Sequence, residues 1–229
     1  MSLYENLLKD EEYLKIVRKI EGMHFITDGK WDWEHGLGHY QRVAEYTRKI
    51  LYQLGADSRT IDLAMFASLL HDLGLSKGDK IDHAIESTKL ATQFIEKVSV
   101  TDQEKDMLYQ AISDHSKGNH ISSHVGLALV LADKLDVTYH RTENSSIQDK
   151  INTEIQKIKR VDIRITDGEL IVIYETDTDF DISILKEWKK TITIPKKVSE
   201  YLDKKFIFML NGNEADYSDI LSPKELFKK

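Results

Sequence analysis

The 229-residue sequence contains no cysteine. Disulfide bonds, thiolate metal sites, iron–sulfur clusters and cysteine nucleophiles are therefore excluded, and the absence fits a reducing cytosol. Proline is scarce, with 2 residues, and glycine reaches only 11, which favours long helices. A chain of this length can bury a substantial core, so we expect one large domain or a main domain with a small appendage.

The sequence also lacks an apolar run long enough to cross a bilayer, and its first residues lack the basic start and apolar core of a signal peptide. We therefore expect a cytoplasmic protein without a membrane partner. The formal net charge is -7, and this negative balance argues against broad binding to nucleic-acid backbones. The composition favours chemistry on a small molecule at a local site.

The hydrophobic pattern predicts helices up to about residue 135, because apolar residues recur there at spacings of three and four. One of these helices begins near Asp57 and ends at the pair His71-Asp72, and another is capped by Thr101, with Glu104 at capping-box spacing. The other predicted helices cover residues 10–20, 39–54, 82–96 and 122–136. Breaks are expected at residues 22–38, 74–78 and 116–119.

The pattern changes after residue 145. Isoleucines from Ile147 to Ile158 predict one more helix, and two β-rich runs, residues 161–165 and 170–174, are joined through Asp167-Gly168. Such runs predict a β-hairpin. Residues 181–190 are expected to be helical, Pro195 to begin a short helix, and residues 205–210 to form a third strand. The fold class is therefore mainly α, a helical bundle with a small C-terminal α+β element.

The pair His71-Asp72 follows a stretch, residues 61–70, that is apolar nearly all round. Such a helix should be buried, and an unpaired buried charge is costly, so the imidazole and the carboxylate need a partner. A metal ion is one economical partner.

Four further residues continue the apolar stripe of their own helix: His39, His83, His115 and Asp133. Each should face the bundle interior, and metal sites in helical bundles are built from such inward side chains. Taken singly, each could be a hydrogen-bonded core residue, but six together are hard to satisfy without metal. His35 lies four residues before His39, but glycines at 36 and 38 weaken a helical link, and it is left out of the set.

Three segments carry a resemblance to the HD superfamily of metal-dependent phosphohydrolases: residues 39–43 (HYQRV), 69–74 (LLHDLG) and 132–136 (ADKLD). The resemblance covers about residues 25–140. It implies that His39, His71, Asp72 and Asp133 bind one metal ion, and His83 and His115 hold the positions that two-metal members add. The set is most similar to the binuclear branch that includes symmetrical diadenosine tetraphosphate hydrolases. We therefore expect an HD-type helical metal-binding domain over residues 1–144 and an α+β appendage over residues 145–229.

Imidazole and carboxylate ligands suit iron, manganese, cobalt, nickel or zinc, and the resemblance implies two ions per chain, bridged by Asp72. The expected activity is cleavage of a phosphoester or phosphoanhydride in a small nucleotide by a metal-activated water. We expect catalytic roles for Asp72, Lys77 and Lys117, and substrate contacts from Arg42, Lys77, Lys117 and His120. For each cation the alternative is a solvated surface charge.

Two other functions remain open on the same ligands: a di-iron oxygenase on an HD fold, and a non-catalytic nucleotide-binding regulator. The C-terminal element could cover the active site, dimerise or bind a regulator. The exposed edge of its hairpin favours a homodimer.

Overall fold

The computed structural model describes residues 2–24, 33–78, 82–116, 121–143, 145, 149–218 and 220–221. The chain forms two compact units, Met1–Phe25 with Trp33–Asp133, and Ile26–Asp32 with Lys134–Lys229. The helical unit ends at Asp133, before the predicted domain boundary at residues 144/145. That boundary stays a prediction. The predicted fold class, mainly α with a small C-terminal α+β element, is confirmed.

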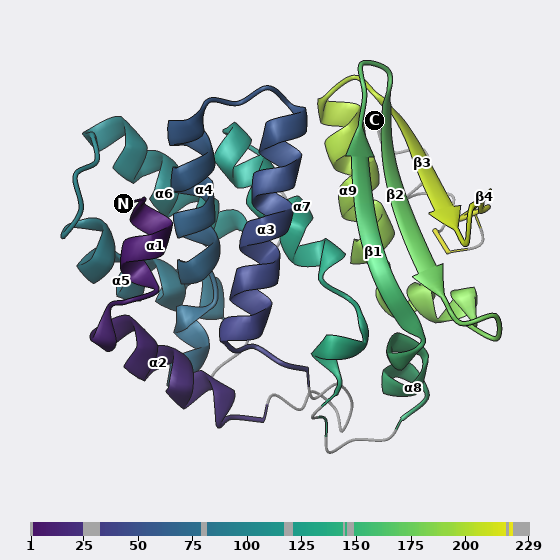
Figure 1. Cartoon of the computed structure of the whole chain (residues 1–229), viewed down its shortest axis with the longest axis horizontal. Coiled ribbons are helices and arrows are strands. Elements are labelled where there is room, and N and C mark those ends of the chain that lie inside the picture. The colour runs from purple at the N-terminus through teal and green to yellow at the C-terminus, as the bar shows by residue number, and fades with distance from the viewer. Residues whose placement is uncertain are drawn as a thin grey trace. The chain divides into compact units, whose positions relative to one another are not determined.

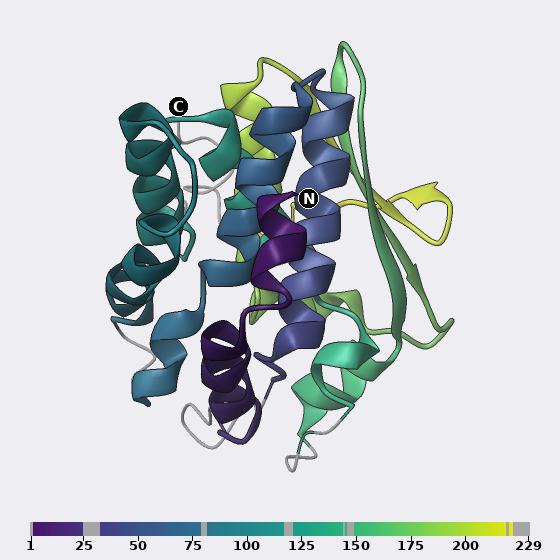
Figure 2. The ribbon, with the colours of Figure 1, turned by 60° about the vertical axis from the view of Figure 1, so that its left-hand side comes forward.

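The first unit is helical and is built around α4 (Figure 1). Its elements are α1 (Leu3–Leu7), α2 (Glu11–Glu21), α3 (Leu37–Gln53), α4 (Ser58–Leu70), the 3-10 helix η1 (Leu73–Lys77), α5 (His83–Ile95), α6 (Asp102–Asp114) and α7 (His124–Leu135), which runs two residues into the second unit. Helices α3 and α4 lie side by side in both views (Figures 1 and 2). Every residue of α4 from Leu63 to Leu70 is buried, as its apolar sequence predicts. Within the described residues, no helix is long and apolar enough to cross a membrane.

Helix ends in this unit follow the predicted caps. The Asp57 side chain accepts a 2.8 Å hydrogen bond from the Thr60 amide at the start of α4. Thr101 and Glu104 form the reciprocal capping box of α6. Gly55 follows α3 with φ 72°, a conformation that favours glycine over residues with a side chain. These caps fix where α4 and α6 begin, and both helices end at a histidine of the candidate site.

Glu104→Ala is expected to lower the free energy of unfolding by about 1–2 kcal/mol at neutral pH, because a cap and an ion pair are lost together. Glu104 also accepts a 2.7 Å hydrogen bond from Arg59 Nε, and these contacts lower the pKa of Glu104 to about 2. Because this folded-state pKa lies below the unfolded value of about 4.3, the contribution is present above pH 4.3 and is lost as pH falls towards 2. Chemical denaturation at pH 7 and pH 3 measures it: a deficit that is equal at both values would contradict this account.

The second unit is a four-stranded sheet with helices. It contains η2 (Tyr139–Arg141), α8 (Lys150–Gln156), β1 (Ile158–Ile165), β2 (Glu169–Thr176), η3 (Ile182–Lys186), α9 (Lys190–Tyr201), β3 (Lys205–Leu210) and β4 (Asn213–Glu214), in the sheet order β1-β2-β3-β4. Strands β1 and β2 form the predicted antiparallel hairpin, with Ile165 opposite Leu170. Strand β3 pairs parallel to β2, and α9 connects the two and packs on both (Figure 1). Strand β1 forms one edge of the sheet. The homodimer expected from the exposed edge of the hairpin stays a prediction.

Three predicted boundaries in this unit are wrong. The helix expected to reach Ile158 ends at Gln156, because Ile158 is buried as the first residue of β1 and pairs with Thr176. Of the helix expected over residues 181–190, the 3-10 helix η3 forms in Ile182–Lys186, and Lys190 is the first residue of α9. Pro195 lies inside α9 and does not begin it. Burial of Ile192 and Ile194 against the core outweighs the local preference of proline for a helix start.

Candidate metal centre

The structure brings all six predicted metal ligands together inside the helical unit. His39 lies in the first turn of α3, and His71 and Asp72 follow the last residue of α4. His83 is the first residue of α5, His115 caps the end of α6, and Asp133 lies near the end of α7. His39, His71, Asp72 and His115 are buried, whereas the side chains of His83 and Asp133 are 14% and 11% exposed. Solvent therefore reaches the cluster beside His83 and Asp133.

Asp72 lies at the centre of the cluster, and its two oxygen atoms face different histidines. Its Oδ2 atom lies 3.4 Å from His71 Nε2 and 3.9 Å from His39 Nε2. Its Oδ1 atom lies 3.1 Å from His115 Nε2 and 3.4 Å from His83 Nε2. The Nε2 atoms of His83 and His115 are themselves only 3.3 Å apart. The two carboxylate oxygens therefore face two groups of imidazole nitrogens, and the ligand atoms of His71, Asp72 and His115 also lie within 4.8 Å of one another.

Asp133 adds a second carboxylate to the Oδ2 group. Its Oδ1 atom lies 3.5 Å from His39 Nε2 and 3.9 Å from His71 Nε2. Two ligand atoms bound about 2.1 Å from one ion lie about 3.0–3.4 Å apart at octahedral or tetrahedral angles. The measured separations are near this range, so small side-chain shifts would let these atoms share an ion.

The backbone fixes two of the rings in the orientation that a metal ligand needs. His71 Nδ1 donates a 2.7 Å hydrogen bond to the Ser68 carbonyl, and His115 Nδ1 donates one of the same length to the Ile112 carbonyl. In the neutral form of each ring, Nε2 then carries the lone pair that a metal ion would bind. His71 Nε2 is buried and has no hydrogen-bond partner among the described residues. The donor set therefore fits a divalent transition metal ion.

The protonation states also suit a cation. Burial raises the pKa of Asp72, but the charge of His71 and hydrogen bonds from His115 and His35 outweigh it and hold that pKa well below its usual range. Burial lowers the pKa of His115. Burial also lowers the pKa of His71, but Asp72 and Asp133 outweigh it and leave that pKa raised. The low pKa of Asp72 favours its charged form, and a bound cation would balance that charge.

Gly74 lets the start of α5 approach the Asp72 segment. Its amide donates a 2.8 Å hydrogen bond to Ser87 Oγ in α5. A Cβ atom at residue 74 would lie 2.1 Å from the His83 carbonyl oxygen and 2.5 Å from the Ser87 nitrogen. Only glycine permits this contact, which places His83 beside Asp72.

The predicted substrate contacts are less defined than the ligands. Arg42 forms a 2.5 Å ion pair with Glu34, and Lys77 is exposed at the end of η1. Lys117 and His120 lie outside the described residues. The catalytic and substrate-binding roles of these four residues stay predictions.

His35 joins the cluster although the sequence analysis left it out. Its Nδ1 atom lies 3.3 Å from Asp72 Oδ2, and its side chain is 9% exposed. The spacing of four residues from His39 was the only signal in the sequence. His35 precedes α3, so helical periodicity cannot place it.

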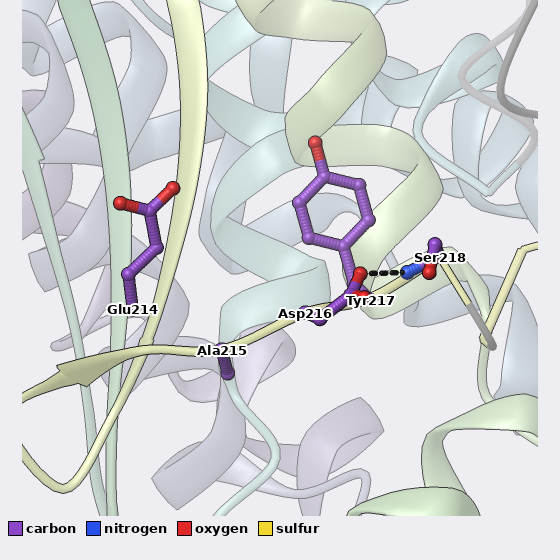
Figure 3. Close-up of a pocket in the computed structure, with 5 residues that line it drawn as sticks. All are labelled: Glu214, Ala215, Asp216, Tyr217 and Ser218. Carbon is purple, nitrogen blue, oxygen red and sulfur yellow. Dashed lines mark hydrogen bonds between the residues drawn. The ribbon is translucent and has the colours of Figure 1, made fainter.

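Two pockets in the C-terminal unit offer less chemistry than the metal cluster. The first is lined by Tyr139, Glu143, Gln156 and Lys159, and Lys159 already forms a 3.0 Å ion pair with Asp177. The second is lined by residues 214–218 (Figure 3), where the Asp216 side chain accepts a 2.8 Å hydrogen bond from the Ser218 amide. Its charged lining residues, Glu214 and Asp216, are acidic, which disfavours a phosphorylated ligand.

Comparison with known proteins finds a similarity for the part of the chain that carries the site. Residues 36–138 match the family model of the HD domain, and this span contains all six predicted ligands. A crystal structure of a predicted HD superfamily hydrolase from an uncultured Thermotogales bacterium is similar at 25% identity, with a TM-score of 0.44, over 60% of this chain and 75% of that one. No curated protein matches the sequence.

Residues 36–138 are thus similar to the HD domain. HD domains bind divalent metals, and the His/Asp groups described above could hold one. The similarity and these groups favour a metal-dependent hydrolase.

Proposed function

We propose that this HD domain is binuclear and hydrolyses a phosphoester or phosphoanhydride bond in a small nucleotide. One observation carries the proposal: Asp72 Oδ2 faces His39 and His71, whereas Asp72 Oδ1 faces His83 and His115. A carboxylate that offers one oxygen to each of two ligand groups has the arrangement of a bridge between two ions.

When bound, the two ions would stabilise charge on a phosphoryl group and activate a water molecule as the nucleophile. The protein's part is to hold its donors in place. Asp72 and Asp133 supply negative charge, and the hydrogen bonds of His71 and His115 to backbone carbonyls fix their rings. Burial of Asp72 keeps bulk water from screening this charge. Substrate would enter where His83 and Asp133 are partly exposed.

The chemistry of the site and the charge of the chain support a small anionic substrate, and a nucleotide is the one we propose. Two cations in a buried cluster attract an anionic group, whereas the net charge of -7 disfavours long nucleic acids. Arg42 and Lys77 are the described candidates for contacts to phosphate outside the metal cluster.

A nucleotide-hydrolysis screen, with the products separated by chromatography, tests the proposal. Metal-free protein is reloaded with manganese, cobalt or iron and assayed, without oxygen, against nucleoside mono-, di- and triphosphates and dinucleoside polyphosphates. We expect hydrolysis of one nucleotide class, dependent on added metal and absent from Asp72→Ala. Turnover only with iron and oxygen would favour the oxygenase, and tight nucleotide binding without turnover on any metal would favour the regulator.

A further inference from the structure

The ligands around Asp72 are unevenly divided. We define the Oδ2 side as His35, His39, His71 and Asp133, and the Oδ1 side as His83 and His115. With Asp72 counted on both sides, the described residues offer five donor residues on the Oδ2 side and three on the Oδ1 side. Divalent transition ions take about four to six ligands. The two sides should therefore differ in how completely protein atoms surround an ion.

His35 is the residue that creates most of this difference. Its Nδ1 atom lies 3.3 Å from Asp72 Oδ2, closer than the Nε2 atoms of His71, at 3.4 Å, and His39, at 3.9 Å. His35, His39 and Asp72 also form a group whose ligand atoms all lie within 4.8 Å of one another. His35 therefore lies as close to Asp72 as the candidate ligands on the helices do.

The segment that carries His35 is tied to two helices of the same unit. Glu34, the preceding residue, forms the 2.5 Å ion pair with Arg42 of α3. The amide of Leu37 donates a 3.0 Å hydrogen bond to Glu21 of α2. A Cβ atom at Gly38 would lie 2.5 Å from Glu34 Oε1, so the glycine lets this ion pair lie against α3. These contacts hold the backbone on both sides of His35.

We propose that His35 is an additional metal ligand and that it makes the Oδ2 side a tightly held, nearly filled site. The Oδ1 side, with three protein donors, is the exchangeable site and keeps open positions for substrate oxygen. This inference rests on the binuclear centre of the proposed function. Arg42 is then a positioning residue that acts on His35 through Glu34.

Cobalt(II) titration of the metal-free full-length protein, followed by calorimetry and visible absorption, tests this division. We expect two binding steps in the wild type, the first tighter than the second. His35→Ala should weaken the first step at least 10-fold, a loss about as large as removal of a ligand's hydrogen-bond partner causes, and alter the absorption of the first equivalent. His83→Ala should weaken the second step and spare the first.

Two variants separate ligation from loss of folding. His124→Ala replaces an exposed histidine of α7 and should change neither step. Arg42→Met should weaken the first step by a smaller factor than His35→Ala; an unchanged first step would overturn the positioning role. Circular dichroism checks that each variant is folded.

The outcomes distinguish this inference from the proposed function. Two steps that are both unchanged in His35→Ala would overturn the role of His35 and leave the binuclear hydrolase intact. A wild-type protein that binds only one ion at saturation would contradict the binuclear proposal itself.

Discussion

Asp72→Ala is expected to reduce the metal content of the protein from two ions per chain to one or fewer and to lower turnover at least about 100-fold. Loss of a residue that only orients a ligand costs about 10–100-fold, and Asp72 is placed to bind directly. Both of its oxygens face imidazole nitrogens at 3.1–3.9 Å. Its removal therefore deprives both ligand groups of their shared negative charge. Elemental analysis of the folded variant and its rate of nucleotide hydrolysis measure the two effects.

Asp72→Asn separates charge from volume. It keeps the size of the side chain and one oxygen but removes the negative charge, and it should lose nearly as much activity as the alanine variant. Asp106→Asn makes the same change at an exposed position of α6 and should alter neither metal content nor rate. Near-normal metal content and turnover in Asp72→Ala would show that Asp72 is not the shared ligand.

Gly74→Ala is expected to displace the start of α5 and, with it, His83. The added Cβ would lie 2.1 Å from the His83 carbonyl oxygen, which is backbone and cannot rotate away. Forcing extra volume into a packed contact costs about 1–3 kcal/mol, which for a chain of this size lowers the melting temperature by about 2–12 °C. Because His83 moves, the metal content should also fall towards one ion per chain. Thermal unfolding and elemental analysis check the two results.

Gly126→Ala provides a matched control. A Cβ at this position in α7 would meet Ser123 Oγ at 3.5 Å and Ala111 Cα at 3.8 Å, which are ordinary contacts. Replacing glycine by alanine inside a helix stabilises it by up to about 1 kcal/mol, so this variant should keep both ions and melt no lower than the wild type. A Gly74→Ala protein that is equally stable and fully loaded would contradict the close approach of α5.

The proximity of the six candidate ligands could be predicted because each lies on, or directly at the end of, a helix with a clear apolar stripe. On such a helix, spacings of three and four determine which side chains face the interior, as His39 and His115 illustrate. His35 could not be predicted in this way. Its position depends on the Glu34–Arg42 ion pair and on the hydrogen bond between Leu37 and Glu21, and neither contact follows from periodicity.

In the C-terminal unit, too, local elements could be predicted from the sequence, but contacts between distant segments could not. The hairpin of β1 and β2 is local, and its alternating residues with Asp167-Gly168 predict it. The parallel pairing of β3 with β2, Leu170 opposite Phe206, joins segments 36 residues apart through α9, and strand periodicity does not specify the partner. Pro195 likewise has a local preference that burial of its neighbours in α9 overrides.

The central claim is that two metal ions share Asp72. The most direct test is a crystal structure of metal-loaded protein with anomalous scattering recorded at the absorption edge of the bound metal. The account predicts two anomalous peaks about 3.5–4 Å apart, one bound by Asp72 Oδ2 with His39 and His71, the other by Asp72 Oδ1 with His83 and His115. A single peak at full metal loading, or two peaks that do not share Asp72, would contradict it.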